Sequence, residues 1–196
     1  SGEPLAKRFR FRWEMDRTAK ASPVRRGVIE RSEDDGEVER GTTMALDAAT
    51  LALTARELKT ALTEAKIAKI FEPTRDELVL TLRTRTDTYS LLLSARSGSA
   101  RVCLTEESFE NPETPPSFCM LMRKHLTGGK LLDVRMEPGD RIVYFEFQCT
   151  NEMGDLVRNI LCAELMGRYS NLVLVQNGKI IDALKRVDFE DSDVRQ

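Results

Sequence analysis

Two short segments place acidic, basic and apolar side chains where strands are expected to begin or end. Asp140 and Arg141 follow a Pro-Gly dipeptide at the head of an apolar run. Glu164, Leu165 and Met166 close another apolar run and precede a glycine. An arginine can make bidentate contacts with a phosphate or a base edge, and a nearby carboxylate can orient it or accept from a base amine.

Each segment also has a purely structural interpretation. The turn would let Asp140 bind backbone amides while Arg141 is solvated. The second segment would be a bulge that joins two strands, with Glu164 paired to a neighbouring cation. The residue types alone favour this structural interpretation at both places.

The cysteines and the single histidine do not form a reactive or metal-binding pattern. His125 is the only imidazole, and no C-x-x-C pair occurs, so no metal site is predicted. Cys119 and His125 are six residues apart on one expected helix, which puts them on different parts of it. All the cysteines are widely spaced in apolar contexts and are expected to be reduced thiols of the interior: Cys103, Cys119, Cys149 and Cys162.

Motifs for cofactors and nucleophilic catalysis are missing from the sequence. Neither G-x-x-x-x-G-K-[ST] nor G-x-G-x-x-G occurs, so no phosphate-cradling loop is predicted. A G-x-S-x-G elbow is absent as well. We therefore expect a binding domain with no cofactor and no catalytic residues, rather than an enzyme.

The composition is that of a soluble globular domain. The chain has 196 residues, of which 41% are hydrophobic and 32% are charged. No apolar run is long enough to cross a membrane. The net charge of −2 argues mildly against nucleic-acid binding by charge alone. Any RNA contact would need a local basic face, or other domains that supply most of the phosphate attraction.

The hydrophobic pattern predicts an α+β fold, in which antiparallel strand groups form a β-sandwich flanked by helices. Asp47 is a suitable cap for a first helix that runs to about residue 61, and a second helix is expected at 117–127. Asn177-Gly178 is a strong signal for a tight hairpin. Strands are expected at 66–72, 77–83 and 88–94, around Val102 and Leu104, and at 130–136, 141–148, 156–165, 171–176 and 179–187.

The chain divides into three regions. Residues 1–43 lack a sustained hydrophobic period, with a basic first half and an acidic second half, and read as a flexible appendage or leader. The basic half can alternatively be read as a nucleic-acid arm. Residues 44–187 form the globular domain, and 188–196 is a polar tail expected to lead to further domains that are absent here.

Ordered matches over this globular region resemble the N-terminal domain of the NFACT family, which includes RqcH, NEMF and proteins called fibronectin-binding protein A. The most specific match is the Asn-Pro to Pro-Pro-Ser-Phe-Cys-Met-Leu-Met-Arg-Lys-His-Leu stretch at 111–126. The other matching segments are 44–47, 69–73, 92–95, 100–102, 139–142 and 164–171.

The resemblance implies a fold like the N-terminal domain of formamidopyrimidine-DNA glycosylases. Those enzymes use an N-terminal proline amine as nucleophile. Here Met44 is followed by Ala45 and Leu46, so lyase chemistry is not expected, and the fold must not be taken for the function.

The resemblance also implies a function in ribosome quality control. Full-length members bind a large ribosomal subunit that carries peptidyl-tRNA, and recruit tRNA to add a C-terminal tail, of alanine in bacteria. An Asp-Arg pair and a Glu-Ile/Leu-Met triplet are tied to tRNA contact in the family. They map onto Asp140, Arg141, Glu164, Leu165 and Met166.

We expect these side chains to lie together on one surface, where Asp140 or Glu164 orients Arg141 and Met166 packs on an RNA base. A cytoplasmic protein is expected. The competing hypothesis is a fibronectin-binding surface adhesin, which the older family name suggests. The sequence lacks a secretory signal and a disulfide framework, so this hypothesis ranks lower.

Overall fold

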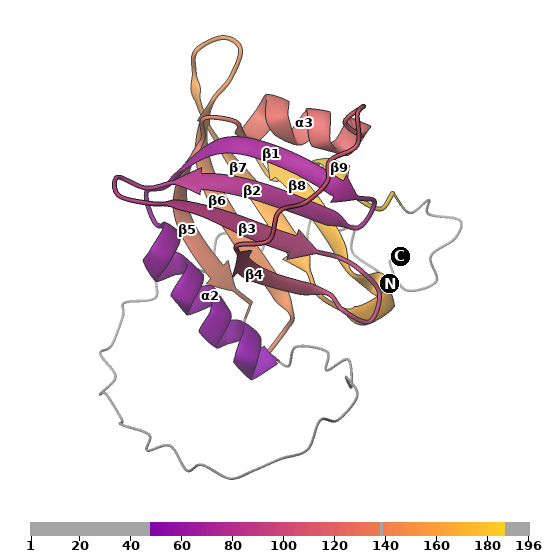
Figure 1. Cartoon of the computed structure of the whole chain (residues 1–196). Coiled ribbons are helices and arrows are strands. Elements are labelled where there is room, and N and C mark those ends of the chain that lie inside the picture. The colour runs from indigo at the N-terminus through magenta and orange to yellow at the C-terminus, as the bar shows by residue number, and fades with distance from the viewer. Residues whose placement is uncertain (1–47, 138, 187–196) are drawn as a thin grey trace, which may run out of the picture.

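The computed structural model describes residues 48–137 and 139–186, which form one antiparallel sheet with two helices (Figure 1). The expectations for 1–43, for the Asp47 cap and for 188–196 lie outside these residues. The helices are α2 (Ala48–Leu62) and α3 (Ser117–Leu126). The strands are β1 (Lys66–Thr74), β2 (Glu77–Arg83), β3 (Thr88–Ser94), β4 (Arg101–Thr105), β5 (Lys130–Met136), β6 (Ile142–Thr150), β7 (Leu156–Glu164), β8 (Asn171–Gln176) and β9 (Lys179–Ala183).

The strands follow the order β4-β3-β2-β1-β5-β6-β7-β8-β9, and every neighbouring pair is antiparallel. The halves β1–β4 and β5–β9 meet at a short junction, where Lys66 pairs with Lys130. Figure 1 shows the first half crossing in front of the second. The predicted pair of strand groups is therefore one sheet that changes direction at this junction.

A common apolar core lies between the two halves. Along β6, Val143, Phe145 and Phe147 are fully buried, and they belong to the same cluster as Leu78 and Leu80 of β2. The alternate residues of β6 face the other side, since successive side chains of a strand point to opposite faces. Removal of these large side chains from water is the main stabilising term of such a core.

The helices close the core at two places. α2 buries Leu51, Ala55, Leu58 and Leu62, which recur at helical spacing, and it packs mainly on β5. α3 buries a second stripe and packs mainly on β1, as Figure 1 shows. A sheet of nine strands with two packed helices agrees with the predicted α+β class.

Most predicted elements are confirmed, with differences at their ends. The strands expected at 77–83, 88–94, 130–136 and 171–176 have those bounds. The hairpin prediction holds, because Asn177 and Gly178 adopt φ values of 51° and 74°, as a two-residue turn of this type requires. β9 ends at Ala183 rather than at 187. Beyond it Lys185 leaves the ladder, and its ammonium binds the carbonyl of Ala95 (2.6 Å).

The cysteines lie in the interior, as expected. Cys119, Cys149 and Cys162 are buried, Cys103 is half-buried, and all of them are free thiols. Burial raises the pKa of Cys119 and Cys149, which keeps both protonated and unreactive. Across 48–137 and 139–186, no group of three or more histidine, cysteine or acidic residues is placed to hold a metal ion. In the same residues, no helix is long and apolar enough to span a membrane.

Candidate nucleic-acid interface

The two segments singled out in the sequence meet at one end of the sheet. Ile142, the first residue of β6, pairs with Glu164, the last residue of β7. The backbone N–H of Leu165 then donates to the carbonyl of Arg141 (2.8 Å). The main chains of the Asp-Arg and Glu-Leu-Met segments are therefore neighbours, as the sequence predicted.

A tight turn holds the Asp-Arg segment in place. The N–H of Asp140 donates to the Glu137 carbonyl (3.1 Å), and Gly139 between them has a φ of 77°, a conformation that favours glycine. One carboxylate oxygen of Asp140 accepts from the backbone N–H of Arg141 (2.8 Å). Asp140 therefore acts on the backbone, as the structural interpretation predicted, and fixes the direction in which Arg141 leaves the turn.

The guanidinium of Arg141 makes no ion pair or side-chain hydrogen bond within the described chain. Strand alternation places its side chain on the same face as Val143 and Leu165, at the end of the core side. The residue is half-buried, so part of its side chain is accessible to solvent at this end of the sheet. An arginine in this position is available to an external anion or base.

Glu164 lies on the opposite face of the sheet. It is 5% exposed, and its charge acts on the thiol of Cys162, two residues earlier on the outer side. Burial, reinforced by Glu164, raises the pKa of Cys162, while the positive charge of Arg135 acts in the other direction. The expectation that Glu164 orients Arg141 on one shared surface is therefore wrong. Period-two alternation separates their side chains although their backbones pair.

Leu165 and Met166 have different environments. Leu165 is 3% exposed and belongs to the main core cluster, so its side chain anchors the segment and does not face a partner. Met166 is half-buried and begins a short 3-10 turn, Gly167–Tyr169, where the sequence suggested a bulge. The turn carries the chain from β7 into β8 beside the Asp-Arg turn.

This turn also holds a cation–aromatic pair that the sequence did not predict. The guanidinium of Arg168 lies over the ring of Tyr169, 4.6 Å from its centroid, and donates a hydrogen bond to its hydroxyl. Tyr169 is 41% exposed. The sequence does contain adjacent arginine and tyrosine residues after a glycine, but whether their side chains stack depends on the conformation of the turn.

We call residues 139–141 and 166–169 the β6–β7 rim. It offers the side chain of Arg141, a second arginine at 168 and an exposed aromatic ring. Guanidinium groups bind phosphates, and aromatic rings stack on unstacked bases. The carboxylate of Asp140 repels an anion that binds too close to it. The β6–β7 rim is therefore chemically able to contact a phosphate and an unstacked base.

Comparison with known families identifies the chain. Residues 47–196 match the family described as NFACT N-terminal and middle domains. The chain belongs to the NFACT family. Its relatives include the Rqc2 homolog RqcH of Streptococcus suis, 39% identical over 71% of this chain, and that of Bacillus subtilis, 38% identical over 67%. The chain spans only about a quarter of these relatives' length, 26% and 23% respectively.

Solved structures also resemble this NFACT domain. The N-terminal domain of fibronectin-binding protein PavA from Streptococcus pneumoniae is 38% identical with a TM-score of 0.67, and the match covers 69% of this chain and 52% of that one. The N-terminal part of the fibronectin/fibrinogen-binding protein from Streptococcus suis gives 38% identity and a TM-score of 0.70, over 73% and 55% of the two chains.

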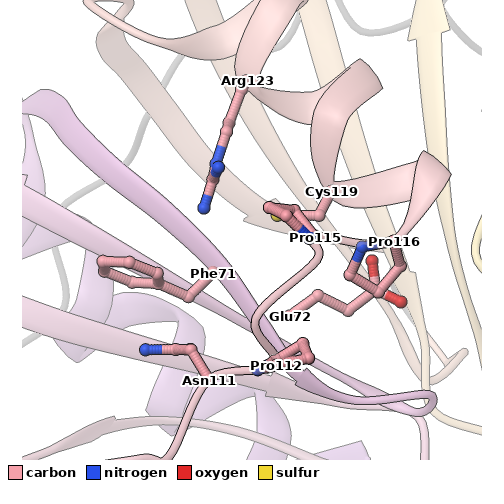
Figure 2. A pocket seen from close by; sticks show the side chains of 8 residues that line it. All are labelled: Phe71, Glu72, Asn111, Pro112, Pro115, Pro116, Cys119 and Arg123. Carbon is pink, nitrogen blue, oxygen red and sulfur yellow. The ribbon is translucent and has the colours of Figure 1, made fainter.

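A second feature of the NFACT domain is a hollow beside α3 (Figure 2). It is a small hollow that opens to solvent. Glu72 from β1 reaches the start of α3, where its carboxylate lies beside Pro116 (Figure 2). The backbone amide of Cys119 hydrogen-bonds this carboxylate. Burial nevertheless raises the pKa of Glu72, because the charged form loses hydration.

This raised pKa predicts a pH-dependent effect of Glu72→Gln on stability. A raised folded-state pKa contributes stability below the usual glutamate pKa, and that contribution is lost as pH rises through the folded value. The buried charge therefore penalises the wild type at neutral pH. Urea unfolding should show Glu72→Gln gaining stability relative to wild type as pH rises from about 4 to about 7.

The matched control for this measurement is Glu152→Gln. The side chain of Glu152 is 80% exposed and pairs with Lys124 at the other end of α3. Its difference from wild type is expected to stay small and nearly independent of pH. A constant gap between wild type and Glu72→Gln over the same range would contradict the assigned burial of the charge.

Proposed function

We propose that this domain is the tRNA- and large-ribosomal-subunit-binding module of a ribosome quality-control factor that adds C-terminal tails, of alanine in bacteria, to stalled nascent chains. One observation carries the proposal. Arg141 is held by its turn without an ionic partner in the described residues, beside the stacked Arg168 and Tyr169. The similarity to proteins named Rqc2 homolog RqcH supports the same function.

At the β6–β7 rim, the turn of Asp140 directs Arg141 toward a phosphate or base edge of a tRNA loop. Met166 and Tyr169 supply apolar and aromatic surface on which an unstacked base can pack. Leu165 holds the segment from inside the core, and Glu164, which is 5% exposed, supports the same end of β7 from the other face of the sheet. The tRNA contact is therefore made by Arg141, Met166 and the Arg168–Tyr169 pair.

The charge of the chain fits a module that supplies specificity more than affinity. The net charge is −2, so general attraction to phosphates is weak. The remaining domains of the full-length protein supply most of the affinity for tRNA and for the large subunit with peptidyl-tRNA, in the cytoplasm. No catalytic role is assigned to this domain.

Co-sedimentation tests this function with the full-length protein. The protein is expected to travel with large ribosomal subunits that carry peptidyl-tRNA, to recover tRNA, and to leave both as the salt concentration rises, because phosphate contacts release counterions. Empty large subunits provide the control. A full-length protein that never sediments with obstructed subunits and recovers no tRNA would remove the proposal.

A second candidate, a fibronectin-binding adhesin, is favoured by the names of the similar solved structures. Binding of the purified domain to immobilised fibronectin, together with surface labelling of intact cells, separates the two. We expect no saturable binding and no surface label. A labelled surface population that binds fibronectin would instead support the adhesin.

A further inference from the structure

Three cations lie side by side on the outer face of the sheet, where its two halves meet. Lys66 of β1 pairs with Arg83 of β2 on one side and with Lys130 of β5 on the other. Directly opposite residues of antiparallel strands point to the same face. That face is turned away from the core, since the adjacent residues of the three strands are buried in the core: Leu82, Ile67 and Leu131.

Lys66 and Lys130 form a close pair across the junction. The backbone N–H groups of Ile67 and Leu131 bond across it, at 2.9 and 2.8 Å, on either side of the two lysines. The lysines are therefore a non-hydrogen-bonded pair, in which the Cα atoms are about 4.5 Å apart and the side chains are closest. Like charges in directly opposite positions destabilise a sheet. An anion bound between them would relieve this repulsion.

Ion pairs balance only part of this charge. The ammonium of Lys130 is 2.6 Å from the carboxylate of Glu64. This hydrogen bond lowers the pKa of Glu64, and the charge of Arg85 in the β2–β3 turn acts in the same direction. Lys66 and Arg83 are exposed and make no ion pair within the residues that the structure describes.

A second row on the same face adds another cation and two hydroxyl groups. Lys69 pairs with Thr81, and Thr81 pairs with Ser90 of β3. Lys69 is exposed and, within the described part of the chain, has no ionic partner. In Figure 1 the start of β1 and the β2–β3 turn lie at the same end of the first half-sheet.

We call Lys66, Lys69, Arg83, Arg85 and Lys130 the basic face. Its five cations are set against the carboxylates of Glu64 and of Asp87, which lies in the β2–β3 turn. The chain as a whole has a net charge of −2, so the basic face concentrates positive charge that the composition does not show.

We propose that the basic face binds the sugar-phosphate backbone of a double-helical RNA segment. The inference rests on the proposed function, since it takes the ligand to be RNA. Lysine, arginine, serine and threonine side chains are the usual contacts to phosphate and sugar. The three cations of the first row lie on adjacent strands and span about 10 Å, so they meet a line of phosphates rather than a single anion.

The other side chains of this region favour a duplex over a single strand. Single-stranded RNA is bound by stacking its bases on exposed aromatic rings, whereas a duplex presents mainly phosphates and 2′-hydroxyls. The ring of Tyr89, between Thr88 and Ser90 on β3, packs against the core. Phe71, two positions beyond Lys69, is half-buried beneath the guanidinium of Arg123, 5.7 Å from its ring centroid.

The basic face is separate from the β6–β7 rim. Lys130 pairs with Gln148 of β6, and the rim lies at Ile142, six residues earlier on that strand. Six residues of extended chain span about 20 Å. The two surfaces therefore contact different phosphates, and each can be removed without the other.

Fluorescence anisotropy of a labelled RNA duplex of about 16 base pairs, titrated with the 196-residue chain at low salt, tests the basic face. Replacing Lys66, Lys69 and Arg83 together by glutamine is expected to lower the affinity at least about tenfold and the salt slope by about three, one for each lost phosphate contact. The variant should unfold in urea no earlier than wild type, because it removes like charges from opposite positions. Lys66→Arg, Lys69→Arg and Arg83→Lys together should keep the affinity, since phosphates require only the charge.

The matched control replaces Arg56, Arg75 and Lys179 by glutamine, which removes the same charge from exposed, scattered sites. This control and Arg141→Ala at the rim should both bind the duplex as wild type does. An equal loss in the two triple variants would overturn the inference. So would a lack of duplex binding by wild type, or equally tight binding of single-stranded oligouridine or of oligoglutamate.

Recovery of tRNA by the full-length protein separates this inference from the proposed function. If tRNA is recovered but the duplex does not bind at the basic face, only the basic face is wrong. If no tRNA is recovered and obstructed subunits do not sediment with the protein, the function is wrong, even where the glutamine variant of the basic face has lost duplex binding.

Discussion

Replacing both Asp140 and Arg141 by alanine in the full-length protein is expected to lower tRNA recovery by roughly ten- to a hundredfold, the range for loss of a bidentate arginine contact. The arginine supplies the contact, and the aspartate holds its backbone direction through the 2.8 Å bond to the Arg141 amide. Neither side chain belongs to the apolar core, so the fold should persist. Affinity purification followed by RNA quantification measures the effect.

Lys179→Ala is the matched control, because it removes one exposed cation at the opposite end of the second half-sheet. It should leave tRNA recovery within about twofold of wild type, as expected for one distant surface charge. Arg141→Lys should recover only part of the binding, since an ammonium is not bidentate. Normal tRNA recovery by the double alanine variant, with its fold intact by circular dichroism, would refute the assignment of the rim.

Phe145→Ala is expected to destabilise the domain by about 3–5 kcal/mol, the usual cost of truncating a buried phenylalanine. Phe145 is fully buried at the middle of β6, in the cluster that joins both halves of the sheet. Its removal leaves a cavity between the two halves, whose described strands pair with each other only at the β1–β5 junction. Urea unfolding followed by circular dichroism measures the loss.

Leu156→Ala provides the comparison for Phe145→Ala. Leu156 begins β7 and is 70% exposed, so the same kind of truncation there should change the free energy of unfolding by less than about 0.5 kcal/mol. A loss below about 1 kcal/mol for Phe145→Ala would mean that the two halves of the sheet do not share this core.

Much of the fold follows from local pattern. The alternation in Val143, Phe145 and Phe147 predicts a strand with one face in the core, and the structure buries all three. Asn177 and Gly178 suit a turn with positive φ at both residues, and they form it. Period-two alternation and turn chemistry act over a few residues, so they can be read without a tertiary structure.

The sequence also predicted, through the resemblance to the NFACT family, that the two rim segments lie next to each other. It did not predict the directions of their side chains. Ile142, rather than Arg141, is opposite Glu164, and this register is set by how β6 and β7 are paired over their whole length. A shift of one residue would reverse every face, and no local signal reports it.

The sequence alone determined the class of the fold, most of its strands and helices, the free interior cysteines and the family. Tertiary structure alone decided that Arg141 and Glu164 emerge on opposite faces, that Arg168 stacks on Tyr169, and that Glu72 lies in a hollow beside α3. The first set depends on contacts between residues close in the chain. The second depends on strand register and on the packing of α3 against β1, which arise only when distant segments meet.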